Sequence, residues 1–370
     1  MSQKDWQVYK FGGTSMKNAD ALEQVGNLVT NSDAENLIVV VSAMGGMTDA
    51  LLQFSETQDS KLIEDIQSLY IETTDSLVKN VSSRLSLIEA FKEDIQAIRE
   101  IAKLKDHASL SIEENEILGF GEIWTSKLLH AYLLALGEIE TSWLNPMDFL
   151  IIQNEDMGAN VNWSKSKEAF TQAIQDKSGK VIMGGFIASD IEGKSTNLGR
   201  NGSDYSASIL GSLSEAQSVT IWTDVDGVLT GDPRVVNQAR MIEQMTYDEA
   251  IELSYFGAEV IHPKTMAPLM HKEIPLYIRN TFNPESLGTS INSQQKNTRA
   301  VKGISTIKDI ALLNLEGTGM IGVPGIVNRL GKVLQQANIS IVLISQASSE
   351  HSICFAVRSK DAQSAADVIK

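Results

Sequence analysis

The sequence predicts an α/β protein with a largely parallel central sheet, followed by a smaller second domain. Short runs rich in β-branched residues, bounded by turn residues, alternate with longer stretches of helical periodicity through most of the 370 residues. This alternation is typical of parallel strands joined by crossover helices. Near the end of the chain the order of the expected elements changes, which indicates a separate unit.

Strands in the larger domain are expected at residues 6–11, 37–42, 180–188, 219–223 and 276–280. Apolar residues recur at helical spacing between the first two, so the chain begins as a βαβ unit. Residues 55–137 show the same spacing and are expected to be mostly helical, with Gly137 as a C-cap. Farther along, Thr246 and Glu249 fit a capping box that opens a helix ending near Gly257.

The stretch 283–298 is rich in Asn, Ser and Gln, and we expect the linker there. The predicted domains are residues 1–292 and 303–370. The smaller one is expected to be ferredoxin-like, because its elements follow the order β-α-β-β-α. These elements are a strand at 310–315, a helix at 326–337, strands at 340–345 and 352–357, and a helix from Asp361. The sequence ends at Lys370, before a last strand, so we expect this domain to be incomplete.

Composition argues against several classes of function. The sequence has 31 Lys and Arg against 47 Asp and Glu, a net charge of -16, and such a charge repels nucleic acid and anionic lipid. No apolar run approaches the roughly 20 residues of a membrane-spanning helix. The start of the sequence has no apolar core of a secretory signal, and the one cysteine, Cys354, has no partner for an internal disulfide. We therefore expect a cytoplasmic protein that binds neither nucleic acid nor membranes.

Three short motifs suggest cofactor or metal sites without the context that such sites need. Residues 317–322 match the dinucleotide pattern G-x-G-x-x-G, but no acidic residue follows about twenty positions later. Residues 193–195 resemble the end of a phosphate-binding P-loop, but Ala188 replaces the required glycine, so a hairpin turn is favoured. Asp224 and Asp226 are turn formers more often than Mg²⁺ ligands. No histidine has zinc-ligand spacing, and no metal ligands are expected from the protein.

Glycine-rich turns follow the first two expected strands, a third lies within the next expected strand at 180–188, and such turns favour anion binding. Lys10 is followed by Gly12 and Gly13 at the start of a helix, where free N–H groups and a mobile ammonium can meet a phosphate. Similar turns lie at residues 42–48 and 184–186. Since ligands of open α/β sheets bind at the carboxyl ends of the strands, we expect these turns to converge on one edge.

Charged residues near these turns suggest a substrate with both charges. Arg200 is suited to grip a carboxylate, while Ser203 and Asp204 stand before a helix, where they can cap it or bind a ligand. Glu122 lies in an apolar helix, so we expect it to be buried and to have a cationic partner.

Six sequence blocks stand in a fixed order: KFGGTS (10–15), VVVSAMGGMTDAL (39–51), GFGEIWTS (119–126), LGRNGSDYSA (198–207), IWTDVDGVLTGDPR (221–234) and SYFGAEVIHPKT (254–265). Through these blocks the sequence resembles aspartate kinases of the amino-acid kinase family, and the segment from Gly303 resembles an ACT regulatory domain. The wording GRNGSDYSA together with LISQASSEHS is most similar to the aspartokinase part of bifunctional aspartokinase/homoserine dehydrogenases.

The resemblance implies a three-layer amino-acid-kinase sandwich followed by an ACT domain. It also implies transfer of the γ-phosphoryl group of ATP to the side-chain carboxylate of L-aspartate, which gives 4-phospho-L-aspartate and opens the biosynthesis of aspartate-derived amino acids. A carboxylate with a pKa of ~3.9 needs no general base at neutral pH. Catalysis should therefore rest on positioning and charge neutralisation, with Mg²⁺ arriving through the ATP phosphates.

The resemblance also assigns roles by position. Lys10, Gly12 and Gly13 match the residues that stabilise the phosphates, and Asp204 matches the residue that organises the active-site cations. The residues that match the family's aspartate-binding positions are Ser42, Thr48, Glu122, Arg200 and Ser203. Arg200 matches the position that binds the α-carboxylate. The residues that match the family's nucleotide-binding positions are Thr223, Asp224 and Arg234.

Two positions depart from the family pattern. Leu229 stands where many relatives have a tyrosine near the nucleotide, and Glu259 stands where many have a lysine. A carboxylate does not replace a cation beside phosphate, and Lys264 could compensate only if the loop differs. The resemblance therefore leaves the nucleotide contacts at this loop open.

The resemblance suggests feedback inhibition through paired ACT domains in a homodimer or a larger homo-oligomer. Threonine is favoured over lysine as the effector, and the turn at 317–325 beside Gln346 is its expected site. Two alternatives stay open. One is a kinase of the same fold for another acidic metabolite, and the other is a catalytically weak amino-acid sensor.

Overall fold

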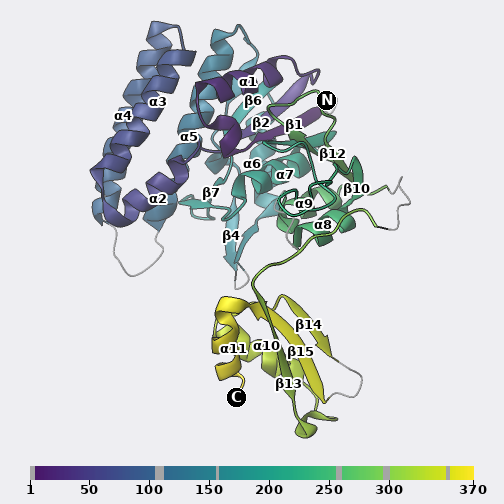
Figure 1. Cartoon of the computed structure of the whole chain (residues 1–370). Helices are drawn as coiled ribbons and strands as arrows, with labels where there is room; N and C mark the ends of the chain where they lie inside the picture. The colour runs from purple at the N-terminus through teal and green to yellow at the C-terminus, as the bar shows by residue number, and fades with distance from the viewer. Residues whose placement is uncertain (1–4, 105–111, 156–157, 256–260, 295–300, 347–350) are drawn as a thin grey trace. The chain divides into compact units, whose positions relative to one another are not determined.

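The computed structural model describes residues 5–104, 112–155, 158–255, 261–294, 301–346 and 351–370. The chain divides into two compact units, Met1–Ser305 and Thr306–Lys370 (Figure 1). Unit 1 contains the large sheet with its helices, and unit 2 contains a small antiparallel sheet. Among the described residues, no helix is long and apolar enough to cross a membrane.

Unit 1 is built on an eight-stranded sheet. Its order is β10 (Gln244–Thr246), β12 (Thr289–Asn292), β11 (Leu276–Asn280), β9 (Ser218–Thr223), β1 (Trp6–Phe11), β2 (Asn36–Val41), β6 (Gly179–Gly184) and β3 (Thr141–Trp143). Every neighbouring pair is parallel except β11 and β12. The predicted largely parallel sheet is confirmed.

Helices cover both faces of this sheet, which gives the predicted three layers. In β2, Leu37, Val39 and Val41 face one core, while Ile38 and Val40 face the other. The first core includes the helices α1 (Ala19–Thr30), α2 (Met47–Thr57), α3 (Ser60–Leu77), α4 (Val81–Leu104) and α5 (Ile112–Ala135). The second includes α6 (Trp163–Ile174), α7 (Gly202–Ser214), α8 (Tyr247–Tyr255) and α9 (Pro263–Met270). A strand buried on both faces reads as a continuous apolar run, which explains the sequence of β2.

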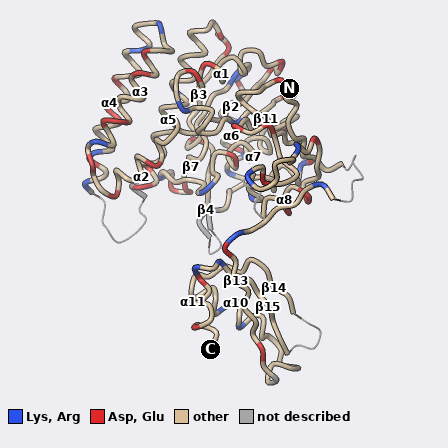
Figure 2. Tube along the Cα trace, viewed as in Figure 1, with Lys and Arg blue, Asp and Glu red and all other residues tan. Residues whose placement is uncertain are grey.

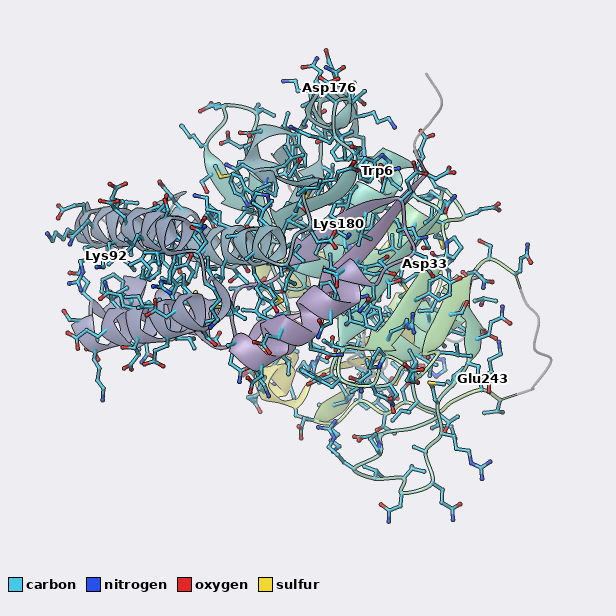
Figure 3. The ribbon with its side chains drawn as sticks, turned by 90° about the horizontal axis from the view of Figure 1, so that it is seen from above. Trp6, Asp33, Lys92, Asp176, Lys180 and Glu243 are labelled. Carbon is cyan, nitrogen blue, oxygen red and sulfur yellow. The ribbon has the colours of Figure 1, made fainter. Side chains whose placement is uncertain are left out.

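The helices α3 and α4 stand as a pair beside α5 (Figure 1). Seen from above, Lys92 on α4 lies on the opposite side of the molecule from Glu243, the residue before β10 (Figure 3). Acidic and basic residues are interspersed along this helix pair (Figure 2). The α3–α4 pair therefore extends away from the edge of the sheet that carries β10.

Most predicted elements of unit 1 are confirmed. The strands β1 and β11 have the predicted bounds, and β2 and β9 each begin one residue earlier. Gly137 has φ +95 and closes α5 as a C-cap, with the N–H of Glu138 donating to Leu133 O at 3.1 Å. The predicted capping box also forms, because Thr246 N–H donates to Glu249 Oε2 at 2.8 Å and Glu249 N–H donates to Thr246 Oγ1 at 3.2 Å. Gly257, the predicted helix end, lies outside the described residues.

Two predictions of unit 1 are wrong in part. The strand expected at 180–188 breaks into β6 and β7 (Ile187–Ser189), because Phe186 between them has φ +67. The linker expected at 283–298 includes β12, a strand of the large sheet. The hairpin expected at 193–195 is confirmed, since it joins β7 to β8 (Ser195–Asn197) in an antiparallel pair. A further hairpin pairs β4 (Ile152–Glu155) with β5 (Gly158–Val161).

Unit 2 has the predicted β-α-β-β-α order. Its elements are β13 (Ile310–Glu316), α10 (Ile326–Gln336), β14 (Leu343–Gln346), β15 (Ser352–Arg358) and α11 (Ala362–Val368). The sheet order is β13-β15-β14 with antiparallel pairs. Leu334 of α10, Phe355 of β15 and Ala365 of α11 belong to its core. The dinucleotide-like residues 317–322 form a short 3₁₀ turn, as the sequence context favours.

Candidate active site

The candidate active site is a cavity of about 390 Å³ at the carboxyl ends of β1, β2 and β6. Residues that the sequence singled out line it together: Lys10, Gly13, Ser42, Thr48, Glu122, Arg200, Ser203 and Asp204. They come from strand ends, loops and helices that are distant in the sequence. The turns after β1, β2 and β6 meet here because these strands are parallel neighbours. The predicted convergence of these turns on one sheet edge is therefore confirmed.

Lys10 and Asp204 form the charged centre of the cavity. Lys10 is the penultimate residue of β1, Asp204 lies in the first turn of α7, and Lys10 Nζ is 2.5 Å from Asp204 Oδ1. Their side chains are 10% and 16% exposed, so water screens the pair little. Asp204 Oδ1 has no aligned hydrogen-bond donor among the described residues, so this is an ion contact. The carboxylate consequently fixes the position of the ammonium.

The turn after β1 leaves open space beside that ammonium. Gly12 lies next to the cavity, and its N–H donates to Trp222 O of the neighbouring strand β9 at 3.3 Å. A side chain at Gly12 would begin 3.4 Å from Lys10 Nζ. The glycine therefore keeps the approach to Lys10 clear for an anion.

Glu122, on α5, is buried at the cavity wall with 3% exposure. Its Oε2 atom has no hydrogen-bond partner among the residues that the structure describes. Burial raises the pKa of Glu122 from 4.5 to about 8, and backbone hydrogen bonds from Ala43 and from Glu122 itself offset only part of this rise. The predicted burial is confirmed. Among the described residues no ion pair joins Glu122 to a protein cation, so the expected cationic partner stays a prediction. The carboxyl group is poised to ionise when a cation enters.

Arg200 reaches the cavity from the loop before α7. The backbone there turns sharply, with φ +74 at Gly199 and φ +58 at Asn201. Within the described ranges, Arg200 forms no ion pair or hydrogen bond, so its guanidinium is available to a ligand. Next to it, Ser203 lies directly against Gly185, where a Cβ atom would come within 2.6 Å of Ser203 Cβ. Gly185 thus lets the start of α7 approach the end of β6.

The predicted nucleotide residues lie outside the lining of this cavity. Thr223 ends β9, next to β1, and its hydroxyl donates to Asp224 Oδ1 at 3.2 Å. Arg234 is 77% exposed on its side chain and donates from Nε to both carboxylate oxygens of Asp232, at 2.9 and 3.2 Å. Glu259 lies outside the described residues. The structure therefore groups the expected substrate residues with Lys10 and leaves Arg234 apart from them.

Comparison with known proteins places this site in a family. Residues 5–280 match the model of the amino acid kinase family. The chain belongs to this family. Residues 313–370 match an ACT domain.

Similar proteins include enzymes of aspartate metabolism. The chain is 36% identical over 381 residues to bifunctional aspartokinase/homoserine dehydrogenase 2 of Arabidopsis thaliana, covering 99% of this chain and 41% of that protein. Among solved structures, E. coli aspartokinase III in complex with aspartate and ADP gives a TM-score of 0.82 at 27% identity, covering 96% of this chain and 79% of that one. The same enzyme with lysine and aspartate gives 0.76 at 25% identity, with 95% and 78% covered. The chain spans less than half the length of the bifunctional relatives.

In the part of the chain that the structure describes, no three or more His, Cys, Asp or Glu side chains form a cluster suited to a metal ion. Asp226 Oδ1 accepts hydrogen bonds from Asn280 Nδ2 at 2.8 Å and Asn283 Nδ2 at 3.0 Å, so this carboxylate ties the segment after β9 to the end of β11.

Several lining residues were not singled out as site residues from the sequence: Met44, Asp49, Phe186 and Asn201. The position of Phe186, directly after two glycines at the end of a strand, was a signal that could have identified it.

Proposed function

We propose that this protein is an aspartate kinase, which transfers the γ-phosphoryl group of ATP to the side-chain carboxylate of L-aspartate and releases ADP. The observation that carries the proposal is the joint presence of the Lys10–Asp204 pair, Arg200 and buried Glu122 around one cavity. The similarity to an enzyme solved with aspartate and ADP supports it.

The cavity suits a zwitterionic amino acid. The guanidinium of Arg200 would bind the α-carboxylate, because it has several donors and no competing protein acceptor within the described residues. The ammonium would approach Glu122, whose unpartnered Oε2 then gains a charge partner and ionises. Ser42, Thr48 and Ser203 would complete the contacts to the substrate.

Phosphoryl transfer brings two anions together, so the main task is to reduce their repulsion. Lys10 would face the transferred group, with the backbone N–H of Gly13 beside it, and Gly12 would keep the approach to the ammonium clear. Asp204 would hold the ammonium in place. No general base is required, because the acceptor carboxylate is already ionised.

We place the nucleotide along the carboxyl end of β9, at Thr223 and Asp224, with Arg234 exchanging Asp232 for a phosphate oxygen. Mg²⁺ would be held by the ATP phosphates and would neutralise their charge. The acidic residues that line the cavity are Asp49, Glu122 and Asp204, and among the described residues they form no cluster that could hold a metal ion by itself.

The domains proposed are a catalytic domain at residues 1–292 and an ACT domain at residues 303–370, which pairs with a second copy in a homodimer or larger oligomer. Threonine is the favoured effector and lysine the alternative, with the exposed Gln346 at the end of β14 as a contact. The lysine complex of E. coli aspartokinase III supports an amino-acid effector. We also propose a cytoplasmic location, which suits a protein with a single cysteine, Cys354.

Hydroxamate trapping tests the proposed reaction. The protein is mixed with Mg-ATP and L-aspartate, and hydroxylamine converts an acyl phosphate to a coloured hydroxamate. We expect product with aspartate and none with the Lys10→Ala variant. Product with glutamate or another acid alone would show a different kinase of this fold. Binding of aspartate and ATP without product would show a sensor.

A further inference from the structure

We propose that Phe186 limits the length of the acceptor and makes the cavity select L-aspartate over L-glutamate, which is one methylene longer. This inference rests on the proposed aspartate kinase function and deepens it. Phe186 is the one aromatic residue among the described residues that line the cavity.

The backbone of Phe186 is strained. Its φ of +67 lies in the left-handed region, which favours glycine, and Ile187 N–H donates to Gly185 O at 2.7 Å across it. This hydrogen bond closes a γ-turn centred on Phe186. Such strain persists only where the surroundings determine the conformation, and it is concentrated at functional sites.

Two hydrogen bonds fix this turn to the segment that carries the substrate residues. Phe186 N–H donates to Ser206 Oγ at 2.9 Å, and Leu198 N–H donates to Phe186 O at 2.9 Å. Leu198 precedes Arg200 by two residues, and Ser206 follows Asp204 by two. The strained turn is therefore clamped on both sides of the loop that presents the guanidinium and the carboxylate.

The ring of Phe186 packs on the first residue of α7. A Cβ atom at Gly202 would lie 2.7 Å from Phe186 Cδ2 and 3.2 Å from Phe186 Cα, so only glycine fits there. Gly202 stands between Arg200 and Asp204 in the sequence, and Asp204 contacts Lys10. A substrate that spans from Arg200 to Lys10 would pass this part of the wall.

Phe186 has little room to move. Its backbone is fixed by three hydrogen bonds and its ring has no space to retreat towards Gly202. An acceptor with one more methylene must displace the ring or lose its contact with Arg200 or Lys10. A difference of one methylene is worth about 10- to 200-fold in kcat/KM in other enzyme pockets.

The test measures kcat/KM for L-aspartate and L-glutamate by ADP release in the full chain and its variants. We expect Phe186→Ala to lower the aspartate-to-glutamate ratio by about tenfold or more. Phe186→Leu, which keeps an apolar side chain of comparable bulk, should restore most of the selectivity. Circular dichroism checks that each variant is folded.

The Phe186→Gly variant distinguishes the effect of the aromatic ring from the effect of the backbone strain. Glycine adopts a positive φ without strain, so this variant should melt at a higher temperature than Phe186→Ala and show the same loss of selectivity. Equal loss of activity towards both substrates, with the ratio within about threefold of the wild type, would show a structural role and overturn the inference. A wild-type protein that phosphorylates no aspartate would instead refute the proposed function and this inference with it.

Discussion

Replacing Glu122 by glutamine should remove a pH dependence of aspartate binding that the cavity builds in. Burial raises the pKa of Glu122 to about 8, so the empty site holds a neutral carboxylic acid at pH 7. Binding of an ammonium favours the ionised form, and a proton must then leave. Linkage therefore makes aspartate affinity rise with pH below the pKa of Glu122.

The size of this effect follows from the pKa. Between pH 6 and 7 only a minor fraction of Glu122 is ionised, and that fraction grows about tenfold per pH unit. The dissociation constant for aspartate should fall about tenfold between pH 6 and 7 and level off near pH 8. The Glu122→Gln variant should bind aspartate more weakly at pH 8, with little change across this range.

Calorimetric titration of aspartate at pH 6, 7 and 8 measures this directly, and buffers of different ionisation enthalpy report the released proton. Glu114→Gln is the matched control, because Glu114 is also buried on α5, at 5% exposure, but does not line the cavity. It should keep the wild-type slope. A wild-type affinity that does not change from pH 6 to 8, with no proton released, would refute the assignment of Glu122 to the ammonium.

Three further variants test other parts of the account. Lys10→Ala should lower kcat by about 100-fold or more in the ADP-release assay. The control Lys17→Ala, which alters an exposed lysine above the Phe282 ring, should change kcat little. A loss of less than about threefold in Lys10→Ala would remove Lys10 from the mechanism. Arg200→Ala should mainly raise the KM for aspartate, and an unaltered KM would contradict its grip on the α-carboxylate. Lys302→Met should lower the free energy of unfolding by about 1–3 kcal/mol in urea at pH 7, because Lys302 Nζ lies 2.6 Å from Glu249 Oε2 and is 9% exposed. Hydrogen bonds from Lys302 and from the capping box outweigh the effect of burial and lower the pKa of Glu249. The difference in the free energy of unfolding between wild type and Lys302→Met should therefore vanish as the pH falls through that pKa. A difference that does not depend on pH would contradict the role of this ion pair.

Local rules predicted much of the fold. The apolar run of β2, the glycine turns after β1 and β2 and the capping box at Thr246 each carry their signal within a few residues. The strand β12 was missed because its signal is tertiary. Thr289 is buried there because its hydroxyl accepts from Val228 N–H at 2.8 Å and donates to Ile242 O at 2.7 Å, both distant in sequence.

The site was predicted to a similar extent. Residues in glycine turns converge because parallel strands require it, so Lys10 and Ser42 were predictable from the sequence. The lack of a partner for Glu122 Oε2 among the described residues was not predictable from the sequence, because the neighbours of a buried side chain are set only when the cavity is assembled. The sequence placed Phe186 in a glycine-rich turn, but its left-handed backbone was not predictable, because it depends on hydrogen bonds to Leu198 and Ser206.

A crystal structure of the protein with L-aspartate and ADP tests the central claim most directly. The account predicts that the α-carboxylate of aspartate lies on Arg200, its ammonium within hydrogen-bond distance of Glu122, and its side-chain carboxylate towards Lys10. Aspartate bound away from this cavity, or with its side-chain carboxylate on Arg200 and its α-carboxylate towards Lys10, would contradict it.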